Sequence, residues 1–174
     1  MENQKLENKY SLWFMPEGDI YKKLTDLIFQ LSEKYSAPNF EPHVTLLHNL
    51  AMPEKEIMAK ASQLAAIIIP FKIKLTKIDY LDEYFRCLFI RAEETKQLTI
   101  VNLKVKEIFN RQGGPKHMPH LSLLYGNFSS KIKEEIIRDI GREFNEIFEV
   151  KSIHLFSSEE DISKWYRIKE FYLK

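Results

Sequence analysis

The feature that most constrains this chain is an internal repeat. Residues 41–47 read EPHVTLL and residues 118–124 read MPHLSLL, and their histidines, His43 and His120, are 120 − 43 = 77 positions apart. At the same offset two apolar pairs coincide, Phe71 with Phe148 and Ile73 with Val150. A pattern that recurs at a fixed separation indicates two similar units. We therefore expect two lobes that are related by a pseudo-twofold axis and share one interface.

Hydrophobic periodicity divides the chain into helices and strands. Apolar residues recur at spacings of three and four in four windows, which predicts amphipathic helices over 20–35, 57–68, 98–108 and 132–144. Thr95 and the pair Ser129 and Ser130 are candidate caps of the last two helices. Aromatic and β-branched stretches predict strands at 10–15, 43–50, 71–80, 85–92, 120–128, 148–156 and 165–173. The predicted order is βαβαββαβαββ, in a single domain over 1–174 made of two repeats (about 10–80 and 84–156) and a C-terminal strand.

Composition excludes several classes of protein. Lys and Arg number 26 against 25 Asp and Glu, so no global field attracts long nucleic acid or an anionic membrane. The longest apolar stretch, 64–70, is far shorter than the roughly 20 residues that cross a bilayer, and residues 1–9 lack a signal-peptide core. The single cysteine, Cys87, can form neither an internal disulfide nor a Cys-based zinc framework. We expect a cytoplasmic monomer without membrane contact.

Each repeat places an imidazole and a hydroxyl on the same face of a strand. Successive side chains of a strand point to opposite faces, so His43 lies beside Thr45 and His120 beside Ser122. A pseudo-twofold axis then brings two imidazoles and two hydroxyls around one cleft. Two histidines near neutral pH can act as base and acid, and hydroxyls can donate hydrogen bonds to phosphate oxygens. The set suits hydrolysis of a small cyclic phosphodiester without a metal.

The repeated motif also resembles a known family. Residues 42–46 and 119–123 are similar to the twin H-x-[ST]-hydrophobic motifs of the 2H phosphoesterases. Within that superfamily, residues 118–126 and the pattern Trp13-x-x-Pro16 resemble the cyclic phosphodiesterases that act on ADP-ribose 1″,2″-cyclic phosphate and nucleoside 2′,3′-cyclic phosphates. The resemblance covers nearly the whole chain. It implies a bilobal α+β fold of two antiparallel-sheet lobes, with helices on the outside and a central cleft.

The resemblance further implies roles for the repeated residues. It makes His43 and His120 catalytic, with His120 as the base and His43 as the acid. It implies that Thr45 and Ser122 bind the phosphate oxygens. The reaction it implies needs no metal and no cofactor. The symmetry of the motif leaves the choice of base open from the residues alone.

Three aromatic residues are further candidates for substrate binding. Tyr125 matches a tyrosine of the family's site, although strict alternation from His120 would turn it to the opposite face unless the strand bends or bulges near Gly126. Phe85, like its neighbour Tyr84, could stack on a nucleobase. The resemblance places Trp13 near the cleft. All three residues, Tyr125, Phe85 and Trp13, have an alternative interpretation as core residues.

The loop before the second motif carries two weaker signals. Lys116 in loop 113–119 could screen a second phosphate of the substrate, although a solvated lysine is the commoner case. His117 and His120 have an H-x-x-H spacing, but Pro119 opposes the helix that would align them and no carboxylate or cysteine lies nearby. We therefore expect no metal site. His48 is another weak candidate for the site, and its simplest interpretation is an exposed histidine at a strand end.

Three functions remain open. The leading one is hydrolysis of a small cyclic-phosphate nucleotide. A rival within the same superfamily acts on RNA ends or 2′,5′ linkages, so RNA ends are a further candidate partner. A rival of another class is a nucleotide-binding module without turnover. The near-neutral charge argues against long RNA, and the intact pair of His and hydroxyl motifs argues against lost catalysis.

Overall fold

The computed structural model describes residues 10–174. This part of the chain forms eight strands and four α-helices, with one 3-10 turn (Ile162–Lys164). The elements follow in the order β1 (Tyr10–Phe14), α1 (Gly18–Tyr35), β2 (Val44–Leu50), α2 (Glu54–Ala65), β3 (Phe71–Asp79), β4 (Leu88–Ala92), α3 (Lys96–Ile108), β5 (His120–Leu124), α4 (Ser130–Ile140), β6 (Glu143–Val150), β7 (Ser152–Ser157) and β8 (Tyr166–Tyr172). The predicted alternation of strands and helices is confirmed, except that the strand expected over 148–156 is divided at Lys151.

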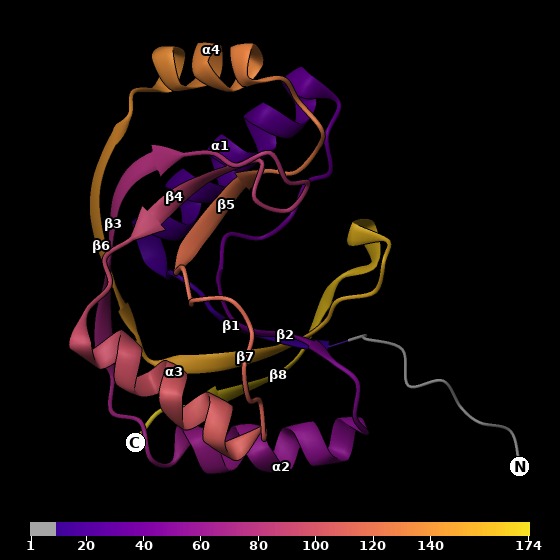
Figure 1. Cartoon of the computed structure of the whole chain (residues 1–174), viewed down its shortest axis with the longest axis vertical. Coiled ribbons are helices and arrows are strands. Elements are labelled where there is room, and N and C mark those ends of the chain that lie inside the picture. Colours follow the sequence, from indigo (N-terminus) through magenta and orange to yellow (C-terminus); the bar gives the residue numbers. More distant parts are fainter. Residues whose placement is uncertain (1–9) are drawn as a thin grey trace, which may run out of the picture.

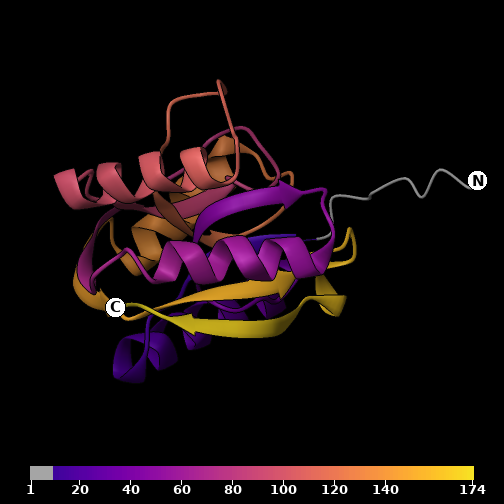
Figure 2. The same cartoon turned by 90° about the horizontal axis from the view of Figure 1, so that it is seen from below.

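All strands belong to one antiparallel sheet, in the order β6-β3-β4-β5-β2-β1-β7-β8. The sheet curls into two lobes that meet between β5 and β2 (Figure 1). Helices α1 and α4 lie on the upper lobe and α2 and α3 on the lower one (Figure 1), and Figure 2 shows α2 and α3 running side by side. The bilobal α+β architecture with outer helices is confirmed.

The two lobes do not correspond to the two repeats of the sequence. Strand β3 follows α2 in the first repeat but pairs with β4 and β6, which belong to the second. Helix α1 likewise packs on β5, whereas α2 packs on β7 and β8. Each lobe therefore contains elements from both repeats, which ties the halves of the chain into one unit.

The strand register shows where the pseudo-twofold axis passes. Val44 of β2 pairs with Leu121 of β5, and 121 − 44 = 77. Lys72 of β3 pairs with Glu149 of β6, and 149 − 72 = 77. A residue that pairs with its own equivalent in a repeat lies on a local twofold axis. Because each histidine of the repeat directly precedes Val44 or Leu121, the two histidines flank that axis.

Alternation of side chains separates the helix-covered core from the cleft face. Strands β2 and β5 contribute alternate residues to the main apolar core, and β1 does the same; these residues are Val44, Leu46, Leu121, Leu123, Leu12 and Phe14. The intervening residues of β1, Trp13 and Met15, pack instead with Phe156 in a separate small cluster. One face of the sheet therefore packs under helices, as the sequence predicts, and the other carries the motif residues.

Helix caps agree with the sequence, while several element ends differ from the predicted bounds. Thr95 and Ser129 accept hydrogen bonds from the backbone at the starts of α3 and α4. Helix α4 ends at Ile140, because Gly141 has a φ of 89° and turns the chain, so Phe144 lies in β6 and not in the predicted helix. No helix within residues 10–174 is long and apolar enough to cross a bilayer.

Strands β4 and β5 are shorter than predicted because a turn interrupts each. The N–H of Leu81 donates to the carbonyl of Arg86, so the chain before β4 forms a loop and Phe85 precedes the strand. The strand β5 ends at Leu124, and the N–H of Gly126 donates to the carbonyl of Tyr84 on that loop. The chain therefore bends near Gly126.

Gly126 offers a test of this bend. Its φ is 150°, and a Cβ added there would collide with the ring of Phe128. We expect Gly126→Ala to lower the free energy of unfolding by about 1–3 kcal/mol, as overpacking typically does. Gly141 is the matched control, because its φ is 89° but an added Cβ meets no heavy atom within 4 Å. Urea unfolding at constant m measures both, and an equal loss in the two variants would contradict the assigned clash.

Candidate active site

The two repeat histidines lie at equivalent points of the sheet. His43 directly precedes β2, and His120 is the first residue of β5. Their neighbours Val44 and Leu121 pair across the junction of the lobes. A positive charge on His120 would lower the pKa of His43, so the two imidazoles are close enough to interact. The structure thus brings the two predicted histidines to the same junction of the lobes.

The same backbone contact holds each imidazole. His43 Nδ1 lies 2.7 Å from the carbonyl oxygen of Glu41, and His120 Nδ1 lies 2.8 Å from that of Met118. A carbonyl can only accept, so Nδ1 carries the proton in both rings and Nε2 is the atom that gains or loses one. In each repeat a proline separates the carbonyl from the histidine, and its fixed φ helps to set this contact.

Burial makes His43 difficult to protonate. Its side chain is buried and stacks on Trp13, with ring centroids 3.6 Å apart and planes 8° from parallel. Desolvation lowers the pKa of His43 to about 4; the charge of His120 acts in the same direction, and the Glu41 carbonyl opposes both effects. His43 is therefore neutral at neutral pH, and it is not a solvent-facing side chain.

His120 is less enclosed and lies beside cations. Burial lowers the pKa of His120 from its ordinary value, and the charges of Arg86 and Arg91 lower it further. Arg91 is the cross-strand partner of His120, and its guanidinium Nε donates to Asp79 at 2.6 Å. The two imidazoles thus have the same backbone contact but different surroundings.

Both motif hydroxyls lie opposite an aromatic residue of the neighbouring strand. Thr45 pairs with Trp13, and Ser122 pairs with Phe89. Each of these rings also touches the histidine of the motif, since Trp13 stacks on His43 and the Phe89 centroid is 5.1 Å from that of His120. Phe89 was not predicted from the sequence, because 89 − 13 = 76 departs by one residue from the repeat offset of 77, which aligns Trp13 with Ile90.

The hydroxyls differ in their present partners. Ser122 is buried, and its Oγ donates to the carbonyl of Phe85 at 3.1 Å. Thr45 is half-buried, and its hydroxyl has no hydrogen-bond partner within residues 10–174. A phosphate oxygen could therefore accept from Thr45 directly, whereas Ser122 must first leave the Phe85 carbonyl.

Tyr125 lies with the motif residues because β5 ends one residue before it. Burial raises the pKa of the Tyr125 hydroxyl, and a hydrogen bond with the Ser122 side chain opposes that rise. The Tyr125 ring stacks on Phe40 with centroids 3.9 Å apart, and the exposed ring of Phe85 meets it edge-on at 5.2 Å. The break in alternation near Gly126 thus turns Tyr125 toward Ser122.

Trp13 lies behind the imidazole of His43. It is only 2% exposed, and it is stacked both on His43 and on Phe156, whose centroid is 3.9 Å away. Both interpretations of this residue therefore hold, since it is buried and contacts a motif histidine. Its position suits support of the imidazole more than contact with a ligand.

The weaker signals of the sequence lie at the margin. Lys116 is exposed and forms an ion pair with Glu94, with Nζ and Oε2 3.3 Å apart. His117 is half-buried, and its pKa is lowered by burial and by the charge of His120. His48 is exposed. Residues 10–174 contain no group of three or more His, Cys, Asp or Glu side chains arranged to hold a metal ion.

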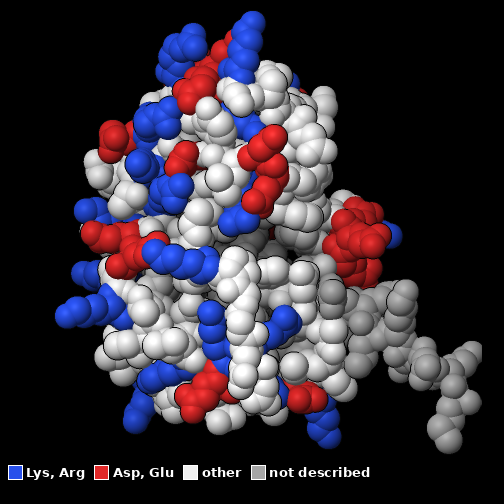
Figure 3. All heavy atoms as spheres, in the orientation of Figure 1, with Lys and Arg blue, Asp and Glu red and all other residues white. Residues whose placement is uncertain are grey.

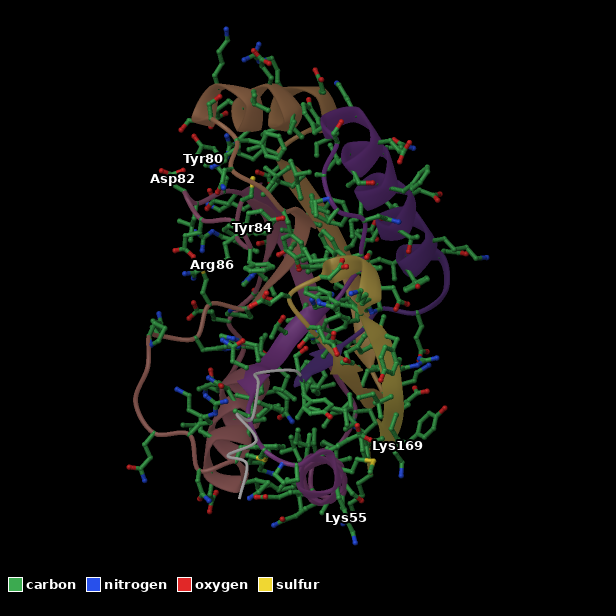
Figure 4. The ribbon with its side chains drawn as sticks, turned by 90° about the vertical axis from the view of Figure 1, so that its right-hand side faces the viewer. Lys55, Tyr80, Asp82, Tyr84, Arg86 and Lys169 are labelled. Atoms are coloured by element: carbon green, nitrogen blue, oxygen red, sulfur yellow. The ribbon has the colours of Figure 1, made fainter. Side chains whose placement is uncertain are left out.

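A buried lysine anchors the loop before β4, and the sequence analysis missed it. Lys133 of α4 is 2% exposed, and its Nζ donates to the carbonyl of Leu81 at 2.8 Å. The same loop provides the carbonyl that accepts from Ser122. In Figure 4 the labelled Asp82, Tyr84 and Arg86 follow one another along this loop. The available signal was the position of Lys133 on the apolar face of a predicted helix.

Trp165 is the third residue that sequence reasoning missed. It lies between β7 and β8, and its ring meets three rings of the site edge-on. The centroid distances are 5.6 Å to Trp13, 6.5 Å to His43 and 6.2 Å to Tyr125. Nothing local in the sequence distinguishes it from an ordinary first residue of a strand.

Comparison with known proteins shows the family to which the chain belongs. The family model described as cyclic phosphodiesterase-like protein matches residues 9–173. The cyclic phosphodiesterase of Arabidopsis thaliana is 24% identical over 125 residues, which cover 72% of this chain and 69% of that protein. The 2′,3′-cyclic-nucleotide 3′-phosphodiesterase of Yarrowia lipolytica is 26% identical over 133 residues, which cover 72% of this chain but only 59% of that protein.

Solved structures share the fold at low sequence identity. E. coli LigT complexed with 3′-AMP superposes with a TM-score of 0.69 at 15% identity, over 97% of this chain and 99% of that one. TT0787 of Thermus thermophilus superposes with a TM-score of 0.66 at 18% identity, over 95% of this chain and 97% of that one. Together with the family match over nearly the whole chain, these results show that the protein is a phosphodiesterase of the cyclic phosphodiesterase-like family, with the 2H phosphoesterase fold.

Proposed function

We propose that the protein hydrolyses a small cyclic phosphodiester, either a nucleoside 2′,3′-cyclic phosphate or ADP-ribose 1″,2″-cyclic phosphate, to a phosphomonoester. The observation that carries this proposal is the matched pair of imidazoles, each with Nδ1 on a backbone carbonyl and Nε2 left to exchange a proton. The names of the two relatives, a cyclic phosphodiesterase and a 2′,3′-cyclic-nucleotide 3′-phosphodiesterase, support the class of substrate.

The proposed reaction uses one imidazole for each proton. Nε2 of neutral His120 takes a proton from water as the water oxygen forms a bond to phosphorus. The bond from phosphorus to one ribose oxygen breaks, and Nε2–H of protonated His43 gives that oxygen its proton. Thr45 and Ser122 donate to the non-bridging oxygens, where charge increases in the transition state. Proton exchange with water then restores both rings.

The assignment of the two roles comes from the family resemblance, and the surroundings of the rings set what it requires. His43 has the lower pKa and is neutral in the free protein at neutral pH, so it acts as the acid only once it is protonated, whereas the less enclosed His120 is the stronger base. The anionic phosphodiester favours the protonated form of a nearby imidazole, so substrate binding promotes the state that the acid needs. The same geometry without turnover would describe a nucleotide-binding module instead.

The first expected outcome is hydrolysis without a metal. Purified protein incubated with 2′,3′-cyclic AMP and excess EDTA should form a phosphomonoester, because both proton transfers and the phosphate contacts come from side chains. Chromatography of the nucleotides measures the product. Binding of the nucleotide with no product would support the binding module and overturn the proposed hydrolysis.

Replacing each imidazole tests the division of labour. His120→Ala and His43→Gln should each lower kcat by roughly 10²- to 10⁴-fold, and His48→Ala, which removes an exposed imidazole from β2, is the matched control. Thermal unfolding checks the fold, since His43 is buried against Trp13. A substrate with a better leaving group needs little protonation, so it should partly restore His43→Gln but not His120→Ala. The opposite pattern would exchange the two roles.

The pH dependence of kcat/KM follows from the lowered pKa values. The base must be neutral and the acid protonated, so log(kcat/KM) should rise with slope near +1 and then fall with slope near −1. Both pKa values lie below the ordinary 6.5 in the free protein, and that of His43 is about 4. The optimum should therefore lie between about pH 4 and 6.5, and the limbs belong to the coupled pair. An optimum above about pH 7 would contradict this protonation scheme.

A further inference from the structure

A cavity of about 230 Å³ lies beside the motif residues, between the β7–β8 connection and the segment that leads into β2. Four aromatic rings line it, those of Trp13, Phe40, Phe156 and Trp165, together with the polar side chains of Asn39 and Glu41. An apolar cavity with a few polar groups at its wall is the usual form of a small-molecule site. None of the proposed steps at the two imidazoles uses it.

The walls of this cavity are also the walls of the candidate active site. Trp13 stacks on His43, and Phe40 stacks on Tyr125. Trp165 lies within 6.5 Å of both His43 and Tyr125, measured between ring centroids. The cavity is therefore about one ring away from His43. A ligand whose phosphate lies between the imidazoles can extend an attached ring into it.

Trp165 is the wall residue best placed for stacking. Both faces of Trp13 are occupied, by His43 and by Phe156, and Phe40 already stacks on Tyr125. The contacts of Trp165 with other rings are all edge-on, so within residues 10–174 no ring is stacked on either of its faces. The Trp165 side chain is also only half-buried. A flat ligand ring can take that position.

The charges around the cavity select the kind of ring. Glu41 Oε1 accepts from the Tyr21 hydroxyl at 2.9 Å, and the exposed carboxylate keeps a second oxygen for another donor. The connection between β7 and β8 adds the exposed carboxylates of Glu159, Glu160 and Asp161. In Figure 3 acidic side chains gather at the right, over the tip of the yellow hairpin of Figure 1. Carboxylates repel phosphate and attract N–H groups. The cavity thus suits an uncharged ring with amino donors.

We propose that this cavity binds the nucleobase of the substrate and favours a base that carries an exocyclic amino group. Trp165 stacks on the base, and the Glu41 carboxylate accepts from the amino group. The proposal rests on the proposed hydrolysis for the position of the phosphate. It adds to that function the part of the protein that chooses among cyclic nucleotides.

Paired substrates test the proposal. Cytosine carries an amino group where uracil carries a carbonyl oxygen, so 2′,3′-cyclic CMP and UMP isolate the contact with Glu41, while glycerol 1,2-cyclic phosphate has no base. Trp165→Ala should lower kcat/KM for cyclic CMP by about 10- to 100-fold, mainly through KM, and bring it closer to that of the base-free substrate. Glu41→Gln should remove the preference for cyclic CMP over cyclic UMP. Tyr166→Ala is the control, an exposed aromatic of the same hairpin that does not line the cavity.

The outcomes separate this proposal from the proposed hydrolysis. If glycerol 1,2-cyclic phosphate and both nucleotides are hydrolysed but Trp165→Ala keeps the wild-type ratio among them, the cavity does not bind the base. If wild type hydrolyses none of them, the hydrolysis is wrong, and calorimetric binding of CMP against ribose 5-phosphate decides on the cavity. Wild type should then bind CMP more tightly, and Trp165→Ala should lose that difference. Trp165→Phe keeps an aromatic ring. An intermediate effect in this variant would show that the loss in Trp165→Ala does not come from misfolding.

Discussion

The pairing of β2 with β5 at Val44 and Leu121 is the constraint on which the rest of the structure depends. It joins the two lobes of the curled sheet, and it lies where the pseudo-twofold axis crosses that sheet. Because a histidine directly precedes each paired residue, the pairing also sets how close the two imidazoles come. A shift of one residue in this register would turn the histidine of the shifted strand to the opposite face of the sheet and so separate the two imidazoles. The fold and the candidate chemistry are therefore fixed by the same backbone contact.

Much of this arrangement could be predicted from the repeat alone. The offset of 77 residues places His43 with Thr45 and His120 with Ser122, and the period of two in a strand puts each pair on one face. The exchange of β3 between lobes could not be predicted, since it depends on pairing between distant segments that leaves no local pattern. The same reason hid Trp165, which reaches the site only because β7 and β8 form the far edge of the lobe. The predicted elements for Phe85 and Phe144 were wrong, because each residue lies next to a turn that makes the element shorter than the periodicity indicates.

The backbone holds the two histidines in the same way, whereas the side chains around them differ. Both imidazoles are held through Nδ1 by a carbonyl two residues earlier. One of them is stacked against Trp13 and nearly excluded from water, whereas the other meets Phe89 edge-on and lies near Arg86 and Arg91. Duplication supplies two equivalent groups, and their surroundings then separate their affinities for a proton. An acid and a base can arise in this way from one ancestral motif.

The lysine that anchors the loop before β4 has a consequence for how a ligand enters. The Lys133 ammonium is buried, with the Leu81 carbonyl as its hydrogen-bond acceptor and exposed Asp82 3.8 Å away. Swinging this loop outward would leave a positive charge in an apolar interior without an acceptor, and an uncompensated buried charge costs several kcal/mol. The loop is therefore a fixed wall and not a lid. The exposed ring of Phe85, which this loop carries, is therefore already in place when a ligand arrives, so little ordering of the loop has to accompany binding.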